Sequence, residues 1–273
     1  MKIIFFCDGN YNQKALAHKI YNRFGLYKIV VKKPSNNINK NIISKKLILV
    51  ILKIFFNLLT LFKFRKVWFA MLSFYKKKYE KFPILPELFV SDINDFKVEK
   101  LVEDSKPDLI IVSGTNLLRE KLISKISIYC KVINLHTGIS PYIKGGPDCT
   151  NWCLFLKEFN LIGNTIMWID KGIDSGNIIS TEQTTLTGKE SLIEIKIKSM
   201  EHGHDLLLRV IDRFCKKVSL PNVSQSKLKP HRLFLTKNWG LKEQIIALFN
   251  YYYHFSPKKI RKTKKRLIPL TPL

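Results

Sequence analysis

Short, continuous runs of apolar residues recur along the first half of the chain, and polar turns follow them. Residues 2–6 and 27–31 form two such runs, with a helical pattern of apolar residues between them. Residues 109–112 and 132–135 are further runs of this kind. A short apolar run without polar alternation is typical of a strand that is buried on both faces of a parallel sheet. The order strand, helix, strand therefore predicts an α/β fold with a doubly wound, mostly parallel sheet.

Domain organisation follows from the length and from where the strand pattern stops. A chain of 273 residues can bury a sizeable core, so one domain with an appendage is expected. We predict a main domain at 1–220 with a helical insertion at about 42–80. Residues 221–273 are predicted to form a small appendage with a basic tail. Within it we expect a small hairpin near 232–239 and an aromatic helix at 242–255.

Three helices of the main domain have recognisable sequence signals. Residues 95–105 fit a helix that ends before a proline, and 150–159 fit a short amphipathic helix. Ser191 and Glu194 have the spacing of a capping box, in which each side chain bonds the backbone N–H of the other residue. Apolar residues at helical spacing follow, so a long helix with one buried side is predicted there.

The net charge of +26 is the most unusual property of the composition. It predicts attraction to an anionic partner, which would be nucleic acid, a phosphate-bearing substrate or an acidic membrane surface. The five cysteines are odd in number and lie mostly in apolar runs, which indicates reduced thiols in a cytoplasmic protein. Cys149 and Cys153 are four residues apart, but no second pair of cysteines or histidines has metal-ligand spacing nearby. We therefore expect no metal site.

One segment bears on membrane contact. Residues 47–62 are largely apolar, but they are shorter than the roughly 20 residues that span a bilayer. A buried helix or a helix lying against a membrane is predicted, and the flanking lysines and arginines would suit anionic headgroups. The chain starts with a strand that runs into a polar turn, so no signal peptide is expected. These features predict a cytoplasmic protein with a potential peripheral contact at the inner face of the membrane.

Three polar residues lie where strands are predicted to end. Asn134 and His136 are separated by one residue at the end of an apolar run, so their side chains point to the same face of a strand. Asp174 lies in a glycine-rich turn between two further predicted strands, 165–169 and 177–180. A carboxylate in that turn could reach the end of the preceding strand. An amide, an imidazole and a carboxylate in one crevice suit acyl transfer, because they can stabilise an oxyanion and move a proton.

The order and spacing of these residues resemble the folate-dependent formyltransferase family. The shared pattern is Asn134-x-His136, then Ser-Pro-Tyr-x-Lys-Gly-Gly at 140–146, then Asp-x-Gly-x-Asp-Ser-Gly at 170–176. The chain departs from the family at residues 137–140, where the usual pattern has Ser and Leu-Leu. The family includes glycinamide ribonucleotide formyltransferase, methionyl-tRNA formyltransferase and nucleotide-sugar N-formyltransferases. The resemblance covers about residues 1–220 and implies a Rossmann-like formyltransferase fold.

The resemblance also implies the reaction and its residues. The donor would be N10-formyltetrahydrofolate, the acceptor a primary amine, and no metal would take part. Asn134 would stabilise the oxyanion, His136 would move a proton, and Asp174 would orient the imidazole or a water molecule. The pterin would bind at Gly114, Asn116, Leu118 and Asp174. Substrate contacts, including a phosphate contact, would come from Gly9, Asn10, Asn12, Tyr142 and Lys144.

The acceptor implied most directly is a nucleotide-linked amino sugar, because the C-terminal segment is short, as in the nucleotide-sugar enzymes. The product would then enter a lipopolysaccharide O-antigen or a capsule. Methionyl-tRNA is an alternative acceptor, which the basic charge favours. A non-catalytic basic module that binds RNA or a membrane is a second alternative. The aromatic residues of the C-terminal segment leave a homodimer open.

Overall fold

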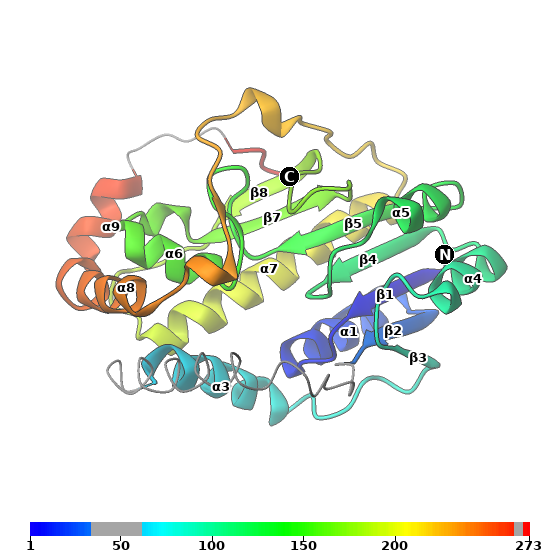
Figure 1. The fold of residues 1–273 in the computed structure, drawn as a ribbon, viewed down its shortest axis with the longest axis horizontal. Coiled ribbons are helices and arrows are strands. Elements are labelled where there is room, and N and C mark those ends of the chain that lie inside the picture. Colours follow the sequence, from blue (N-terminus) through cyan, green and yellow to red (C-terminus); the bar gives the residue numbers. More distant parts are fainter. Residues whose placement is uncertain (34–61, 265–269) are drawn as a thin grey trace, which may run out of the picture.

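The computed structural model describes residues 1–33, 62–264 and 270–273. Their centre is a seven-stranded sheet with helices on both faces (Figure 1). The strands are, in sheet order, β3 (Glu87–Val90), β2 (Lys28–Lys32), β1 (Ile3–Cys7), β4 (Leu109–Ser113), β5 (Lys131–His136), β7 (Gly163–Trp168) and β8 (Ile178–Gln183). The strands from β3 to β5 are parallel, whereas β7 is antiparallel to both β5 and β8. The prediction of an α/β fold with a mostly parallel sheet is confirmed.

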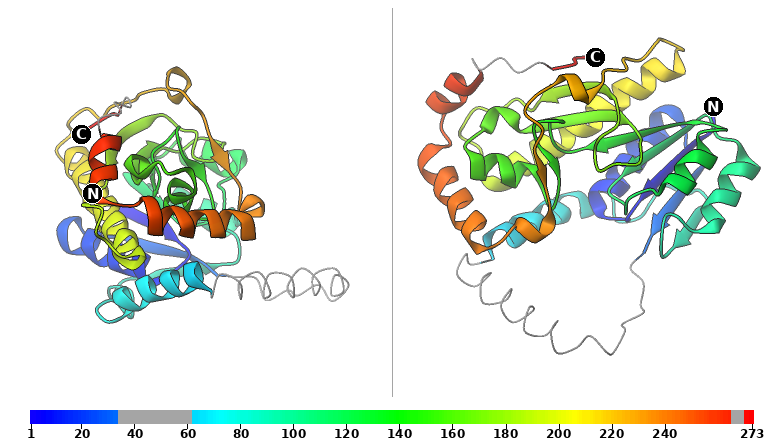
Figure 2. Two further views of the ribbon diagram at one scale, coloured as in Figure 1. Left: turned by 90° about the vertical axis from the view of Figure 1, so that its left-hand side faces the viewer. Right: turned by 45° about the horizontal axis from the view of Figure 1, so that its top comes forward.

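Helices cover both faces of the sheet, and further helices lie beyond one end of it (Figures 1 and 2). The helices are α1 (Tyr11–Phe24), α3 (Lys63–Lys76), α4 (Phe96–Ser105), α5 (Glu120–Ile126), α6 (Cys149–Leu156), α7 (Leu192–Cys215), α8 (Leu241–His254) and α9 (Pro257–Lys264). One face of the sheet packs against α1 and α7, and the opposite face packs against α4 and α5. None of the helices in the described part of the chain is long and apolar enough to cross a membrane.

The central strand β1 shows why its sequence lacks polar alternation. Ile3 and Phe5 belong to the hydrophobic cluster under α1 and α7, whereas Ile4 and Phe6 belong to the cluster under α4 and α5. All four side chains are completely buried. Successive side chains of a strand point to opposite faces, so a strand covered on both faces must be apolar at every position.

The long helix α7 begins as its sequence predicts. The Ser191 hydroxyl accepts a hydrogen bond from the Glu194 N–H at 3.3 Å, and the Glu194 carboxylate accepts one from the Ser191 N–H at 2.7 Å. This capping box satisfies two backbone donors that the first turn of a helix leaves free. The helix places Leu206, Leu207 and Val210 against the sheet, where they are fully buried.

Of two predictions for the second half of the chain, one is confirmed as a helix but wrong in its amphipathic character, and the other is wrong. The expected amphipathic helix is α6, which is shorter than predicted, and its first six residues are all buried. It lacks a solvent face because α8 packs on it. The expected hairpin near 232–239 is replaced by β9 (Leu233–Phe234), which pairs in parallel with β6 (Lys144–Gly145). In both places the packing or pairing partner is distant in the sequence, α8 for α6 and β9 for β6.

The C-terminal segment packs against the main domain. Helix α8 is confirmed close to its predicted limits, and the side-chain amide of Asn250 donates to the carbonyl oxygens of Leu154 and Phe155 at 3.0 and 2.7 Å. Ala247 and Phe255 are buried in the same hydrophobic cluster as α6. The domain boundary at residue 220 stays a prediction. The apolar segment 47–62 lies almost wholly outside the described residues, whereas α3 lies within the predicted insertion.

His204 on α7 gives a prediction for the pH dependence of folding. Its side chain is 1% exposed, and burial, assisted by the nearby Lys19 ammonium, holds its pKa well below the usual 6.5. The unfolded chain binds a proton as the pH falls below about 6.5, whereas the folded chain does not, so acid weakens folding. We expect the urea concentration at the midpoint of unfolding to be lower at pH 5.5 than at pH 7.5. His204→Leu should reduce this difference, and an unchanged difference would contradict the assignment.

Candidate active site

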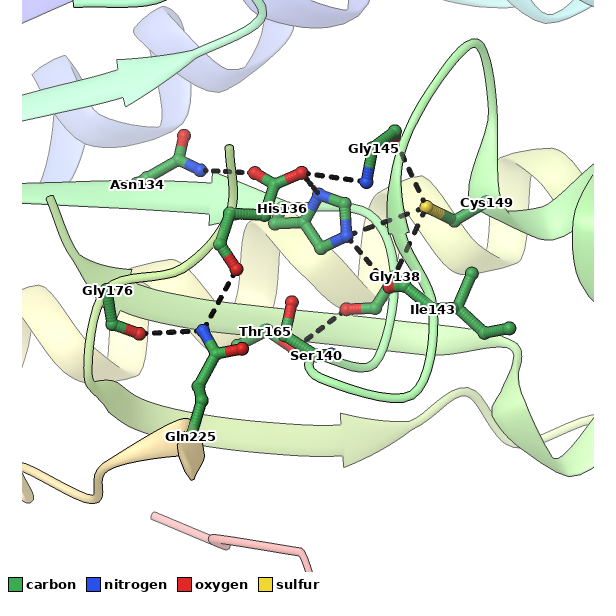
Figure 3. A network of polar contacts seen from close by, with 11 residues as sticks. Asn134, His136, Gly138, Ser140, Ile143, Gly145, Cys149, Thr165, Gly176 and Gln225 are labelled. Carbon is green, nitrogen blue, oxygen red and sulfur yellow. Dashed lines mark hydrogen bonds and ion pairs between the residues drawn. The ribbon is translucent and has the colours of Figure 1, made fainter. Parts of the chain in front are cut away.

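The polar residues predicted from the sequence meet at the carboxyl end of β5 (Figure 3). Asn134 and His136 occupy alternate positions near the end of this strand, so both side chains lie on the same face. His136 is 7% exposed, and Asn134 is partly exposed. The neighbouring strand β4 ends at Ser113, and the loop that follows it lies beside them in one cavity. Ligands of parallel sheets commonly bind at this edge, beyond the carboxyl ends of the strands.

Asp174 connects the two residues of β5. It lies in the turn between β7 and β8, and its φ of 47° is in the left-handed region. One carboxylate oxygen accepts a hydrogen bond from the Asn134 amide at 3.3 Å, and the other lies 3.2 Å from Nδ1 of His136. The second oxygen also accepts from the backbone N–H of Gly145 at 3.0 Å. The carboxylate thus holds the amide, the imidazole and the adjacent loop in one network.

Gln225 supports the turn that presents Asp174, and the sequence analysis did not identify it. Its side-chain amide donates to the carbonyl oxygens of Asp174 and Gly176, at 2.9 and 2.7 Å (Figure 3). Gln225 is 4% exposed, so water competes little for these hydrogen bonds. It lies beyond α7, 51 residues from Asp174, and no local sequence pattern marks the contact. We infer that Gln225 positions the turn.

The second nitrogen of the His136 ring faces the loop after β5. Nε2 lies 3.2 Å from the carbonyl oxygen of Ile143 and 3.5 Å from the sulfur of Cys149 (Figure 3). Burial raises the pKa of the Cys149 thiol well above its usual value, so the group is a neutral thiol near pH 7. The imidazole is therefore held from both ends, by a carboxylate and by this loop.

Gly138 explains one departure from the family pattern. A β-carbon at this position would lie 2.5 Å from Nε2 of His136 and 2.8 Å from the sulfur of Cys149. Carbon atoms do not approach these atoms so closely without displacement. Glycine at 138 is what lets the loop pass next to the imidazole.

Gly138→Ala is expected to displace the His136 ring and to lower catalytic activity by at least about 10-fold, because misplacement of a reacting group by about 1 Å is costly. Gly25→Ala is a matched control for folding, since a β-carbon there meets no atom within 4 Å. Because Gly25 has a φ of 77°, the control is expected to lose some stability but to keep its activity. Steady-state kinetics of the two variants checks this expectation. Unchanged activity of Gly138→Ala would contradict the close packing.

The cavity next to these residues has a volume of about 500 Å³. All four residues that the resemblance assigns to the pterin line it, namely Gly114, Asn116, Leu118 and Asp174. The Asn116 amide group donates to the Asp92 carboxylate at 2.8 Å, and its oxygen accepts from the N–H of Ile93 at 3.2 Å. Its side chain therefore holds the loop, which leaves the backbone of this loop to face the cavity.

The predicted substrate residues are not all brought together. Asn10 and Asn12 line a second cavity of about 320 Å³, whereas Gly9 lines a separate surface pocket. Tyr142 is 1% exposed and packs in the hydrophobic cluster that includes α6. Lys144 pairs with Leu233 in the small sheet. The roles of these residues in substrate binding stay predictions.

The two cavities adjoin at the end of β5. Gly114, Leu135, Thr137 and Pro147 line both of them, and His136 lies between Leu135 and Thr137 in the chain. Two molecules bound in the two cavities would therefore lie close together at these shared residues, and His136 lines the larger cavity. In the described part of the chain, no three histidine, cysteine, aspartate or glutamate residues are placed to hold a metal ion.

Comparisons with known proteins agree with this geometry. Residues 77–211 match the formyl transferase family. The chain is 28% identical to methionyl-tRNA formyltransferase of Syntrophus aciditrophicus over 177 residues, which are 63% of this chain and 55% of that protein. The chain thus spans about half the length of the curated relatives it matches.

Solved structures share the fold. A sugar N-formyltransferase from a Shewanella species aligns with a TM-score of 0.54 and 12% identity, over 92% of this chain and 87% of that one. An N-formyltransferase from Helicobacter canadensis, solved with folinic acid and dTDP-3-aminofucose, aligns with a TM-score of 0.54 and 13% identity, over 93% and 82%. Fold, site and sequence similarity define a formyltransferase domain. The matched segment and the related sequences support a folate-dependent formyltransferase family for this chain.

Proposed function

We propose that this protein transfers a formyl group from N10-formyltetrahydrofolate to the primary amine of a nucleotide-linked amino sugar. The observation that carries the proposal is the network of Asn134, His136 and Asp174, which lines the larger of two adjoining cavities. A donor and an acceptor can each occupy one cavity and meet at this network. Bringing two reactants together in this way removes much of the entropic barrier to their reaction.

The side chains at the junction can serve amide formation. Asn134 carries N–H groups that can donate to an oxygen as it gains negative charge. His136 can accept the proton that the attacking amine loses and can return a proton to N10 of the donor as the bond from N10 to the formyl carbon breaks, because an imidazole is a good proton acceptor near neutral pH. Asp174 lies 3.2 Å from Nδ1 of the ring and can stabilise the positive charge that the ring acquires. No covalent bond to the protein is required.

The larger cavity fits the folate donor, which supplies the formyl group when bound. Its volume of about 500 Å³ is in the range of small-molecule sites. The Thr115 hydroxyl, which lies in the loop lining this cavity, is buried without a hydrogen-bond partner among the described residues. The loop at 114–118 also presents backbone groups, which can bind a flat heterocycle with donors and acceptors. We assign the donor to Gly114, Asn116, Leu118 and Asp174.

The acceptor belongs in the smaller cavity, where Asn10 and Asn12 lie. Similarity in fold to sugar N-formyltransferases supports an amino sugar as the acceptor. The product would enter an O-antigen or a capsule. A cytoplasmic protein could deliver it near the inner face of the membrane. The exposed side chains of Phe249, Tyr252 and Tyr253 on α8 suit peripheral membrane contact or a homodimer.

Mass spectrometry can test this function. The protein is incubated with N10-formyltetrahydrofolate and a panel of dTDP- and UDP-linked amino sugars, and a mass gain of one formyl group is sought. We expect one sugar to be formylated by the wild-type protein. Absence of formylation across the panel would contradict the assignment of the acceptor.

Methionyl-tRNA is the second candidate acceptor, favoured by the net charge of +26 and by sequence similarity to methionyl-tRNA formyltransferases. The same assay with charged initiator tRNA separates the two candidates, and strong salt dependence is expected for a tRNA substrate. A non-catalytic module that binds RNA or a membrane is the third candidate. It predicts that Asn134→Ala and His136→Ala leave the biological role intact.

A further inference from the structure

Lys196 on α7 is buried in the wall of the smaller cavity, which also contains Asn12 and Ser199. We propose that Lys196, held by Asp148, binds hydroxyl groups of the acceptor's sugar ring and so determines which acceptor reacts. The inference rests on the proposed function. It assigns this cavity to a hydroxylated ring that carries an amine, in place of the phosphate contact expected from the sequence.

An ion pair fixes the position of the Lys196 ammonium. Lys196 is 7% exposed, and its ammonium contacts one carboxylate oxygen of Asp148. The other oxygen of Asp148 accepts from the N–H of Thr150 at 3.0 Å, at the start of α6. An ammonium can donate three hydrogen bonds, and Asp148 is its only recorded partner within the described residues. Lys196 therefore retains donors for a ligand.

Unsatisfied polar groups gather at this cavity. The side-chain oxygens of Asn12 and Ser199 are buried and have no hydrogen-bond partner within the described parts of the chain. Both residues are more than nine-tenths buried, at 7% and 3% exposed, and both line the cavity with Lys196. Buried polar groups in folded proteins are normally paired, so several unpaired ones in a single cavity indicate a polar ligand.

The charges of the cavity favour a polyol over a phosphate. Asp8 and Asp148 contribute two negative charges and Lys196 one positive charge, so the charged lining residues sum to minus one. A phosphate would be repelled by this lining, whereas an amine that arrives as an ammonium ion would be attracted. Hydroxyl groups both donate and accept, as the mixture of Lys196, Asn12 and Ser199 requires.

One wall of the cavity is apolar and comes from α3. Trp68 and Met71 of this helix line the cavity and give it apolar surface, whereas Lys196 and Ser199 of α7 give it polar groups. A sugar ring has hydroxyl groups at its edges and C–H groups on its faces, so it matches a site with one polar and one aromatic side. The volume of about 320 Å³ is at the small end of ligand sites, which suits a single ring.

Kinetics with the acceptor identified by mass spectrometry tests the proposal. We expect Lys196→Met to raise the KM for the amino sugar by about 10- to 100-fold, the range for loss of a hydrogen bond to a charged group. The KM for N10-formyltetrahydrofolate should stay within about twofold. Inhibition by dTDP or UDP without the sugar should also be unchanged, because the phosphates lie outside this cavity. Lys196→Arg should restore part of the lost affinity.

Ser199→Ala is the second variant, chosen because it removes a single hydroxyl and leaves the ion pair intact. It should raise the KM for the amino sugar about 5-fold or more without changing the urea midpoint of unfolding. Unchanged acceptor KM in both variants would overturn the proposal while the formylation activity of the wild type stood. Equal weakening of sugar and of dTDP or UDP would also overturn it, since that result places the phosphates in this cavity. If no amino sugar is formylated or bound, the proposed function and this inference both fail.

Discussion

His136→Ala is expected to lower kcat for formylation by about 10²- to 10⁴-fold, the usual contribution of a positioned acid–base group. The imidazole is 7% exposed and lines the larger cavity, so bulk water replaces it poorly. The KM values for both proposed substrates should change little, because the role proposed for the ring is proton transfer at the reacting atoms. Single-turnover kinetics with the amino sugar measures this effect.

His231→Ala is the control, because it removes the same kind of ring. The His231 side chain is exposed and makes none of the contacts that join Asn134, His136 and Asp174. This variant should retain wild-type kinetics. Circular dichroism and urea unfolding of His136→Ala should show a folded protein, because Asp174 and Asn134 remain paired. A fall of less than fivefold in kcat would show that another group moves the proton.

Asp174→Asn is expected to cause the second large loss, again about 10²- to 10⁴-fold in kcat. The carboxylate accepts from the Asn134 amide and the Gly145 N–H and faces Nδ1 of His136, at 3.3, 3.0 and 3.2 Å. An asparagine has one oxygen, so its NH₂ group must face at least one of these donors. The substitution also removes the negative charge that stabilises a protonated imidazole.

Asp104→Asn makes the same chemical change at an exposed position of α4 and serves as the matched control. Asp174→Asn should lower kcat whereas Asp104→Asn leaves it unchanged, and urea unfolding should show that both variants are folded. Activity like that of the wild type would remove Asp174 from the proposed mechanism.

Gln225 lies outside the part of the chain that matches the formyl transferase family. The match to the formyl transferase family ends within α7, at residue 211. Gln225, which holds the Asp174 turn, therefore lies outside the matched region, although it acts on the centre of the site. The C-terminal segment of this chain thus supports the candidate site directly, as well as packing against α6.

Local sequence patterns determined much of the architecture. The strands β1, β2, β4 and β5 were predicted within one or two residues, because continuous apolar runs arise where both faces of a strand are buried. The start of α7 was predicted from its capping box, whose atoms all lie within four residues. The Asn134-x-His136 spacing placed both side chains on one face because side chains alternate along a strand.

Tertiary structure decided what those patterns do not contain. Cys149 lies 3.5 Å from His136, Gln225 lies 2.9 Å from the Asp174 carbonyl oxygen, and Lys196 contacts Asp148. Each contact joins segments that only the packing of loops and helices brings together. The burial of α6 likewise required α8, which follows it by about 90 residues. Local spacing sets which way a side chain faces, whereas its partner depends on the path of the whole chain. The polar lining of the smaller cavity is therefore apparent only in the folded protein.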